Sequence, residues 1–267
     1  MSFIQLLLLN IPTVILGIII VFLYVIVSII GLYIVRAFHP PQKFKLHNDV
    51  AGFIFATLGV IYAVMLAFLV IVTWQNYDEA EKNVTREANY IASVYRDTRP
   101  LPASFRNELK KDLIDYVNFI VNDEWQIMSK GERSQNVQQS QDEIWRLFSN
   151  YIPKNETQKI FFAESVKKLN ESFEMRRMRL LEANSGIHPI LYFILIVGGI
   201  ITVSFTLFFG TENFVPQLIM TSMLAAMIAI ALFTVIALDY PFTGDISVKA
   251  DVFRNVLKTL MSSTEAL

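Results

Sequence analysis

The chain has 267 residues, of which 54% are hydrophobic and 21 are phenylalanine, and its formal net charge is −1. This composition favours a membrane protein, and the near balance of charge without a long basic run argues against a nucleic-acid partner. Because the chain contains no cysteine, it excludes a disulfide, a thiolate metal site and a cysteine nucleophile.

Four charge-free stretches are long enough to cross a membrane as helices. About 20 helical residues, rising 1.5 Å each, span a hydrocarbon core of about 30 Å. The stretches are residues 11–35, 50–72, 189–209 and 216–238. Residues 3–9 are apolar too, and they either extend the first span or form a separate interfacial turn, because Asn10 and Pro12 interrupt the run. The pattern predicts an integral membrane protein with four transmembrane helices.

The second span has two different faces. At 100° per residue its small residues fall on one stripe, which suits close contact with neighbouring helices. That stripe consists of Gly52, Ala56, Gly59, Ala63 and Ala67. Roughly opposite lies a row of larger residues, Thr57, Ile61, Met65 and Phe68, flanked by Ile54 and Val72. The row faces lipid, another helix or a pore, since hydrophobic constrictions can gate pores by dewetting.

The second span continues without glycine or proline into a charged helical pattern, so one helix is expected to cross the membrane and project into water. The charges are most simply a solvated face with i, i+4 pairs such as Asp78 with Lys82. In an oligomer they would repeat as rings near an axis and form a pore mouth. The charged residues are Asp78, Glu79, Glu81, Lys82, Arg86 and Glu87.

The segment between the second and third spans predicts a helical soluble domain inserted between them. Apolar residues recur at helical spacing over residues 75–98, 102–128 and 156–183, with a shorter helix after a polar loop at 129–140. Pro102 is placed to open the second helix, and Asn155 to cap the last one. We therefore divide the chain into 1–73, a first transmembrane pair; 74–187, the helical domain; 188–238, a second pair; and 239–267, a turn and helix.

The sequence LDYPFTGD, residues 238–245, follows the fourth span and predicts a turn. Its Pro-Phe pair is placed to dock a C-terminal helix, at about residues 248–261, back onto the domain. The residues that carry this turn are Asp239, Pro241, Phe242 and Gly244. Asp239 and Asp245 lack the denser acidic cluster of a cation site, so no metal is predicted.

Four spans place both termini and the central domain on one side of the membrane. The two short loops on the other side carry Arg36, Lys43 and Lys45. Nine basic residues near the span ends mark the domain side: Lys82, Arg86, Lys168, Arg176, Arg177, Arg179, Lys249, Arg254 and Lys258. The excess favours a cytoplasmic domain.

Motifs of catalysis and cofactor binding are missing from the sequence. It contains no G-x-S-x-G, Walker loop, H-E-x-x-H or G-x-G-x-x-G, and Gly198-Gly199 lies inside a span, where close helix packing is the expected use. We predict no enzyme activity and no cofactor.

Residues 47–102, HNDVAGFIFATLGVIYAVMLAFLVIVTWQNYDEAEKNVTREANYIASVYRDTRPLP, together with ALDYPFTGD at 237–245, resemble the bestrophin-like family of bacterial membrane proteins. Within them, LVIVTWQNYDEA at 69–80 is similar to the end of the second span of the bestrophin anion channels. The resemblance implies a homopentamer in the bacterial inner membrane, with its termini in the cytoplasm and the second helix lining the axis. It places the hydrophobic neck on Thr57, Ile61 and Met65, with Phe68 next.

Two departures from the family pattern bear on function. Bestrophins carry a basic residue directly before the tryptophans, whereas Thr73 precedes Trp74 here, which leaves the preference for anions open. The dense acidic calcium site of animal bestrophins has no counterpart after Leu238, so calcium gating is not implied. The leading hypothesis is an oligomeric channel for chloride or other small anions. The alternative is a non-conducting membrane scaffold or sensor that binds a cytosolic partner through its helical domain.

Overall fold

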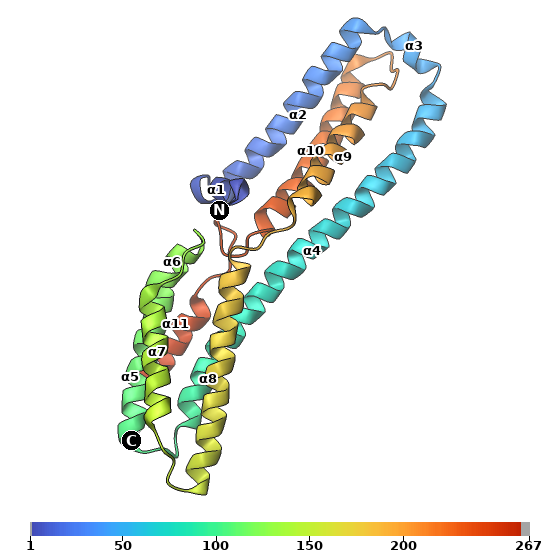
Figure 1. Ribbon diagram of the computed structural model, residues 1–267. Helices are drawn as coiled ribbons and strands as arrows, with labels where there is room; N and C mark the ends of the chain where they lie inside the picture. Colours follow the sequence, from blue (N-terminus) through green and yellow to red (C-terminus); the bar gives the residue numbers. More distant parts are fainter. Residues whose placement is uncertain (1, 263–267) are drawn as a thin grey trace.

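Apolar runs and amphipathic patterns build an elongated helical molecule with two halves, which lie end to end in Figure 1. The computed structural model describes residues 2–262, and within that range every regular element is helical. This agrees with the all-α class predicted from the sequence. We call the two halves the apolar half and the charged half.

The apolar half contains α2 (Thr13–Phe38), α9 (Pro189–Thr206), α10 (Phe214–Leu238) and residues 48–72 of α4 (Asn48–Asp97). By length and composition, α2, α4, α9 and α10 are the four helices that can cross a membrane within the described range. The predicted spans are therefore present, with shifted ends: the first begins two residues later and ends at Phe38, and the third ends at Thr206.

The helix α4 joins the two halves. It runs for 50 residues without a break, which corresponds to about 75 Å at 1.5 Å per residue. Asp49 lies in its first turn, where a carboxylate complements the helix dipole. Its apolar part packs on α9 and α10, and its charged part packs along α8 and α11. The predicted passage of one helix from the apolar span into the charged pattern is confirmed.

Two short helices lie outside the spans. The helix α1 (Phe3–Asn10) is separate from α2, which decides between the two interpretations of residues 3–9. Its N-cap is Ser2, and the chain turns at Pro12 before α2 begins. The helix α3 (Pro41–Lys45) links α2 to α4 at the far end of the apolar half (Figure 1).

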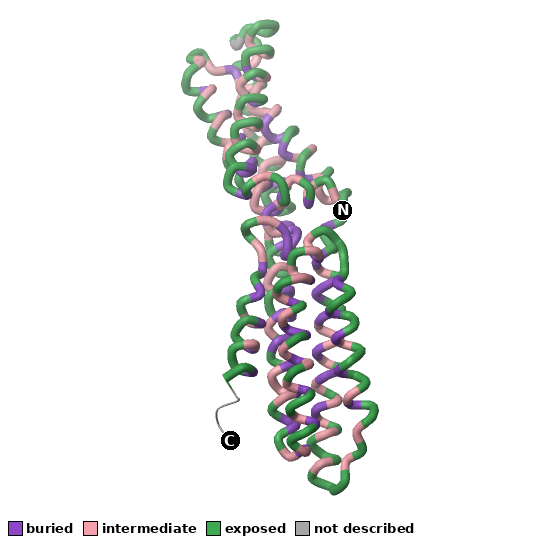
Figure 2. Tube along the Cα trace, turned by 90° about the vertical axis from the view of Figure 1, so that its left-hand side faces the viewer, coloured by how far each residue is buried: buried purple, intermediate pink, exposed green. Residues whose placement is uncertain are grey.

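The charged half surrounds a continuous apolar core. Its helices are α5 (Ala103–Phe119), the π-helical segment η1 (Ile120–Glu124), α6 (Trp125–Met128), α7 (Gln135–Asn150), α8 (Glu156–Glu182) and α11 (Asp251–Ser262), with residues 73–97 of α4. Figure 2 shows the buried positions of this half as a regular stripe along its helices.

The boundaries in the charged half differ from the prediction in three places. A π-helical turn interrupts the helix predicted over 102–128, and such turns cannot be read from apolar spacing alone. The polar loop is shorter, because the Ser134 hydroxyl accepts a hydrogen bond from the backbone N–H of Val137 and starts α7 at Gln135. The last helix begins at Asp251 instead of residue 248. Asn155 caps α8 as predicted.

Candidate pore helix and buried charge network

The apolar part of α4 packs on its own chain through one face, which contains Tyr62, Leu69 and Thr73. The Tyr62 hydroxyl donates to the carbonyl oxygen of Leu195 on α9, at 3.1 Å. A Cβ atom added at Gly198 would lie 2.7 Å from the Tyr62 ring. Glycine is therefore needed at this helix crossing, as expected for Gly198-Gly199 inside a span.

The stripe of small residues on α4 does not pack against any helix of its own chain. A Cβ atom added at Gly52 or Gly59 would meet nothing within 4 Å, and Ala56, Ala63 and Ala67 are exposed. The contact expected with neighbouring helices is therefore absent within the protomer. Lipid or a helix from a second copy of the chain would therefore have to cover the stripe.

The predicted neck row borders a groove between α4 and α9. Thr57, Ile61 and Met65 line this groove, whose volume is about 630 Å³, and Phe193 and Ile201 belong to its other wall. Ile61 is 58% exposed, and Phe68, which lies outside the groove, is 65% exposed. Three residues of the row thus line a groove within their own protomer, whereas Phe68 is exposed on the surface outside this groove.

A third face of α4 was not identified from the sequence. It lies between the neck row and the small stripe, opposite the face that packs on α9 and α10. Its members are Phe53, Val60, Val64 and Ile71, all well exposed. In the single protomer, this is the face of α4 farthest from the helices of its own chain.

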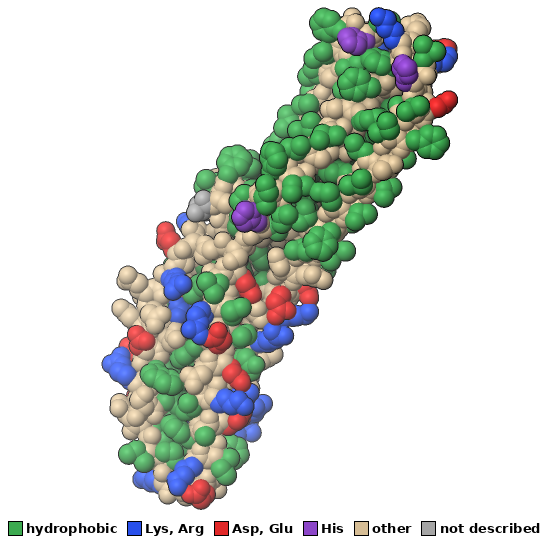
Figure 3. Space-filling model, turned by 45° about the vertical axis from the view of Figure 1, so that its right-hand side comes forward, with side chains coloured by type: hydrophobic (Ala, Val, Ile, Leu, Met, Phe, Trp, Pro, Cys, Tyr) green, Lys and Arg blue, Asp and Glu red, His purple; other side chains and the backbone are tan. Residues whose placement is uncertain are grey.

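The predicted mouth residues lie on the solvated surface of α4, just beyond the apolar span. Lys82 pairs with Asp78, and Arg86 pairs with Glu79 at 3.0 Å. Figure 3 shows acidic and basic side chains together in this region, below a surface dominated by hydrophobic side chains. Because two of these four side chains are acidic and two are basic, their formal charges cancel.

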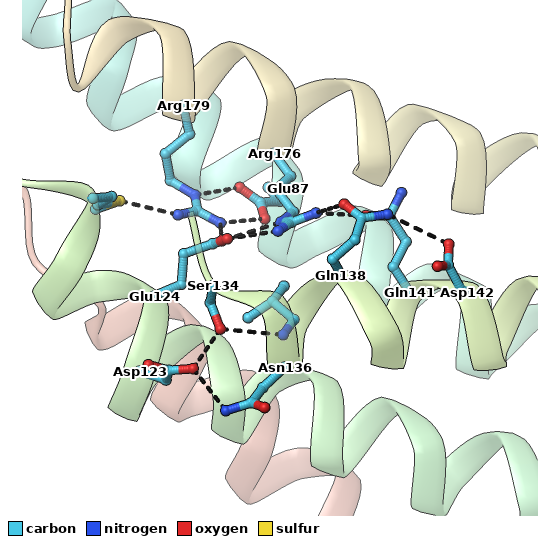
Figure 4. A network of polar contacts seen from close by, with 12 residues as sticks. Glu87, Asp123, Glu124, Ser134, Asn136, Gln138, Gln141, Asp142, Arg176 and Arg179 are labelled. Atoms are coloured by element: carbon cyan, nitrogen blue, oxygen red, sulfur yellow. Dashed lines mark hydrogen bonds and ion pairs between the residues drawn. The ribbon is translucent and has the colours of Figure 1, made fainter. Parts of the chain in front are cut away.

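Glu87 corrects the expected solvated face, because its side chain is completely buried. Both of its carboxylate oxygens accept hydrogen bonds from the Arg179 guanidinium on α8, at 2.8 and 3.0 Å. Arg179 also donates to Glu124 of η1 at 3.0 Å. Figure 4 shows how α4, α8 and η1 direct these side chains toward one point.

A second arginine extends this cluster toward α7. Arg176 binds both carboxylate oxygens of Glu124, at 3.1 and 2.6 Å, and also donates to the side chains of Gln138 and Gln141. Two carboxylates and two guanidinium groups thus form one network of Glu87, Glu124, Arg176 and Arg179, whose formal charges cancel. We call it the buried charge network.

Aromatic and sulfur contacts surround the remaining surface of Arg179. Its guanidinium lies 5.1 Å from the Trp125 ring centroid and 5.7 Å from that of Phe253, and it donates to the sulfur of Met128 at 3.1 Å. Burial alone would raise the pKa of the Glu124 carboxyl, but the hydrogen bonds and charges of the two arginines outweigh it and lower that pKa. Burial has the larger effect on Glu87 and raises the pKa of its carboxyl despite the contact with Arg179. The network therefore favours the charged form of Glu124 and joins α4 to α8 and η1.

The turn after α10 is also tied into the charged half. Asp239 is buried and accepts hydrogen bonds from the backbone N–H of Ile187 and the hydroxyl of Tyr192, both at 2.7 Å. Phe242 packs on Trp125 with ring centroids 5.9 Å apart, and Trp125 in turn packs on Phe253 of α11.

Two backbone features shape the rest of this turn. The Pro241 carbonyl accepts from the N–H of Val248 at 2.8 Å. Gly244 has φ of 85°, a value that favours glycine. Within residues 2–262, no three His, Cys, Asp or Glu side chains gather into a group that could hold a metal ion.

Comparisons with known proteins agree with this architecture. A family model described as the Bestrophin-like domain matches residues 22–253. A search of curated proteins gives no match. Among solved structures, a mutant of a bacterial bestrophin homolog from Klebsiella pneumoniae is similar, with a TM-score of 0.73 and 13% identity over 93% of this chain and 99% of that one.

Two further structures give the same result. The Klebsiella pneumoniae bestrophin homolog solved by Zn-SAD phasing has a TM-score of 0.71 and 14% identity, over 92% of this chain and 97% of that one. A structure described as a membrane protein variant has a TM-score of 0.72 and 10% identity, over 92% and 98%. These TM-scores show a shared fold, and the family model spans most of the chain. The chain therefore belongs to the Bestrophin-like family.

Proposed function

We propose that this protein is an oligomeric ion channel, which passively conducts chloride or other small anions through an axial pore lined by α4. The observation that carries the proposal is the packing of α4. Its apolar part contacts its own chain through a single face, while the neck row, the small stripe and the face between them remain uncovered or open to a groove. A ring of protomers, in the proposal a homopentamer, would cover the stripe and bring the α4 helices around an axis.

The pore in this proposal has a hydrophobic neck at Thr57, Ile61, Met65 and Phe68. Its mouth is formed by Asp78, Glu79, Lys82 and Arg86, which an oligomer would repeat as rings. Small inorganic ions would pass the neck when it is wetted, because dewetting of an apolar constriction blocks conduction. Thr73 carries no charge, and because it is buried with its hydroxyl donating to the Leu69 carbonyl oxygen, its side chain would not line the pore.

Ion flux from liposomes that contain the purified protein tests the neck. Replacing Ile61 and Met65 by alanine removes apolar volume from the row and is expected to raise the flux several-fold. The matched control replaces Val60 and Val64, which lie on the neighbouring face, and is expected to leave the flux near that of the unchanged protein. Absence of flux in every ionic condition would contradict the channel. Flux that changes only in the Val60 and Val64 variant would move the pore to that face.

We place the protein in the bacterial inner membrane, with both termini and the charged half in the cytoplasm. The nine basic residues on that side, against three in the opposite loops, support this orientation. Lipid would then contact the exposed apolar residues of α2, α9 and α10.

One observation favours the alternative, a membrane scaffold or sensor that binds a cytosolic partner. Ile152 and Ile160, on either side of the turn into α8, are 80% and 67% exposed at the end of the charged half farthest from the spans. A partner that docks at this end of the charged half would cover these two apolar side chains. Mass measurement of the purified protein in detergent separates the two functions: a monomer or dimer favours the scaffold, and a ring of several copies favours the channel.

A further inference from the structure

We propose that α1 is an interfacial anchor, which lies along the membrane surface beside the charged half and inserts Phe3 and Leu6 into the lipid. This inference concerns how each protomer is seated in the membrane, and it does not depend on ion conduction. It rests on the position of α1, on the chemistry of its exposed face and on its attachment to the turn after α10.

The position of α1 coincides with the border between the two halves. The side chain of Gln5 is buried and donates to the carbonyl oxygen of Ala183, at 3.1 Å, directly after α8 ends. Leu8 packs with Leu16 and with Tyr240, which follows the last residue of α10 by two positions. Figure 1 shows α1 beside the ends of α2 and α10, at the level where the charged half begins. A helix at this level meets the headgroup region of a bilayer that surrounds the four spans.

The face of α1 that points away from the protein is mainly apolar, and its polar residue Asn10 donates its side-chain amide to the carbonyl oxygen of Leu6 at 2.7 Å. Phe3 is 74% exposed, and Leu6 and Leu9 are exposed too. Arg36 is the first charged side chain of the sequence. A short helix with one docked face and one apolar face, at the edge of a hydrocarbon layer, has the properties of an interfacial helix.

Two backbone N–H groups at the start of α1 have hydrogen-bond partners within the protein. Ser2 and Gln5 form a capping box, in which the Ser2 hydroxyl accepts from the Gln5 N–H and the Gln5 side chain accepts from the Ser2 N–H. These bonds satisfy two N–H groups that a helix end would otherwise leave to water. The cost of bringing this helix end close to lipid is therefore reduced.

A reciprocal contact ties the start of α2, three residues after α1 ends, to the turn after α10. The backbone N–H of Thr13 donates to the Asp245 carboxylate at 2.8 Å, and the Asp245 N–H donates to the Thr13 hydroxyl at 3.2 Å. The adjacent Ile246 lines an apolar groove with Val14 and Ile18 of α2. The exposed apolar surface thus continues from α2 and α10 onto the post-span turn, against which Leu8 of α1 also packs, so lipid is the occupant that matches it.

The absence of cysteine from the sequence permits a direct test. Single variants Phe3→Cys and Leu6→Cys carry a nitroxide label, and the labelled protein is placed in nanodiscs of phosphatidylcholine and phosphatidylglycerol. Collisions of the label with oxygen, which concentrates in lipid, are compared with collisions with a water-soluble nickel complex. Ile18→Cys, exposed on α2, supplies the lipid reference, and Ile152→Cys supplies the water reference.

The anchor predicts an oxygen-to-nickel ratio for Phe3→Cys and Leu6→Cys that is several-fold above the ratio for Ile152→Cys and close to that for Ile18→Cys. A ratio equal to that of Ile152→Cys would overturn the proposal, because the helix would then face water. Labels shielded from both reagents would also overturn it, because protein would then cover this face. Neither result would alter the flux measurement, so the anchor and the channel can fail independently.

Discussion

The two halves of this protein differ in how much of their structure a single chain completes. In the charged half, α4, α5, α7, α8 and α11 enclose a continuous core, and even four charged side chains are buried there with partners. In the apolar half, α4 buries only 11% of its most hydrophobic stretch and α2 only 17%. The charged half therefore buries its core within one chain, whereas the apolar half leaves apolar surfaces exposed that lipid or other protomers would cover.

The largest expected effect comes from breaking the buried charge network in the charged half. Replacing Arg179 with methionine keeps much of the side-chain volume but leaves Glu87 and Glu124 without their shared partner. Removing one member of a buried ion pair typically costs about 3–5 kcal/mol. We expect the free energy of unfolding to fall by this amount, measured by thermal or denaturant unfolding in detergent.

The neighbouring Arg177 offers a matched control for this substitution. Its side chain is 66% exposed and pairs with Glu174 on the same helix. Exposed pairs contribute about 0.2–1 kcal/mol, so Arg177→Met should leave stability almost unchanged. Equal effects of Arg177→Met and Arg179→Met would show that the network does not hold the charged half together.

A smaller effect is expected from glycine replacements that distinguish covered from uncovered surfaces in the apolar half. Gly198→Ala places a Cβ atom 2.7 Å from the ring of Tyr62, and overpacking of this kind costs about 1–3 kcal/mol. Gly59→Ala enters open space in the protomer and should stabilise the helix by about 0.5–1 kcal/mol. Thermal unfolding in detergent compares the two variants.

Gly59→Ala also has a second readout. If the stripe of small residues is a contact between protomers, the substitution should shift the population from oligomer toward monomer, measured by size-exclusion chromatography with light scattering. An unchanged oligomer would show that the stripe is a lipid-facing surface.

Much of the architecture could be predicted from the sequence because it follows from residue spacing. Charge-free runs of membrane length predicted the four spans, and the uninterrupted pattern through Trp74 predicted that α4 is one helix. The faces of α4 were also separable by angle. Spacing cannot say what covers each face, however, so the groove beside Ile61 and the outward position of Val60 required the structure.

The buried charge network was not predicted from the sequence. Glu87 was assigned to a solvated face because charged side chains are rarely buried. Its spacing carried the opposite signal, since it falls between Val84 and Ile91 on the stripe that faces the core. Glu124 lies in the π-helical segment η1, where α-helical spacing does not apply, so its burial required the structure. A carboxylate that falls on a core-facing apolar stripe therefore predicts a buried basic partner, even though carboxylates are usually exposed.

The smallest expected effect concerns the surface where the two halves meet. Lys82 is exposed and pairs with Asp78 one turn earlier on α4. Water and salt screen such an exposed i, i+4 pair, so Lys82→Ala should leave the free energy of unfolding nearly unchanged. If the pair belongs to a pore mouth, the same substitution removes one positive charge from every protomer and should lower anion flux relative to cation flux, most strongly at low salt, where screening is weak. If the Lys82→Ala variant keeps both its stability and its ion preference, Lys82 lies on an ordinary solvated face. If the variant keeps its stability but loses anion flux, Lys82 lies at the pore, because stability reports a structural role and ion preference reports an electrostatic one.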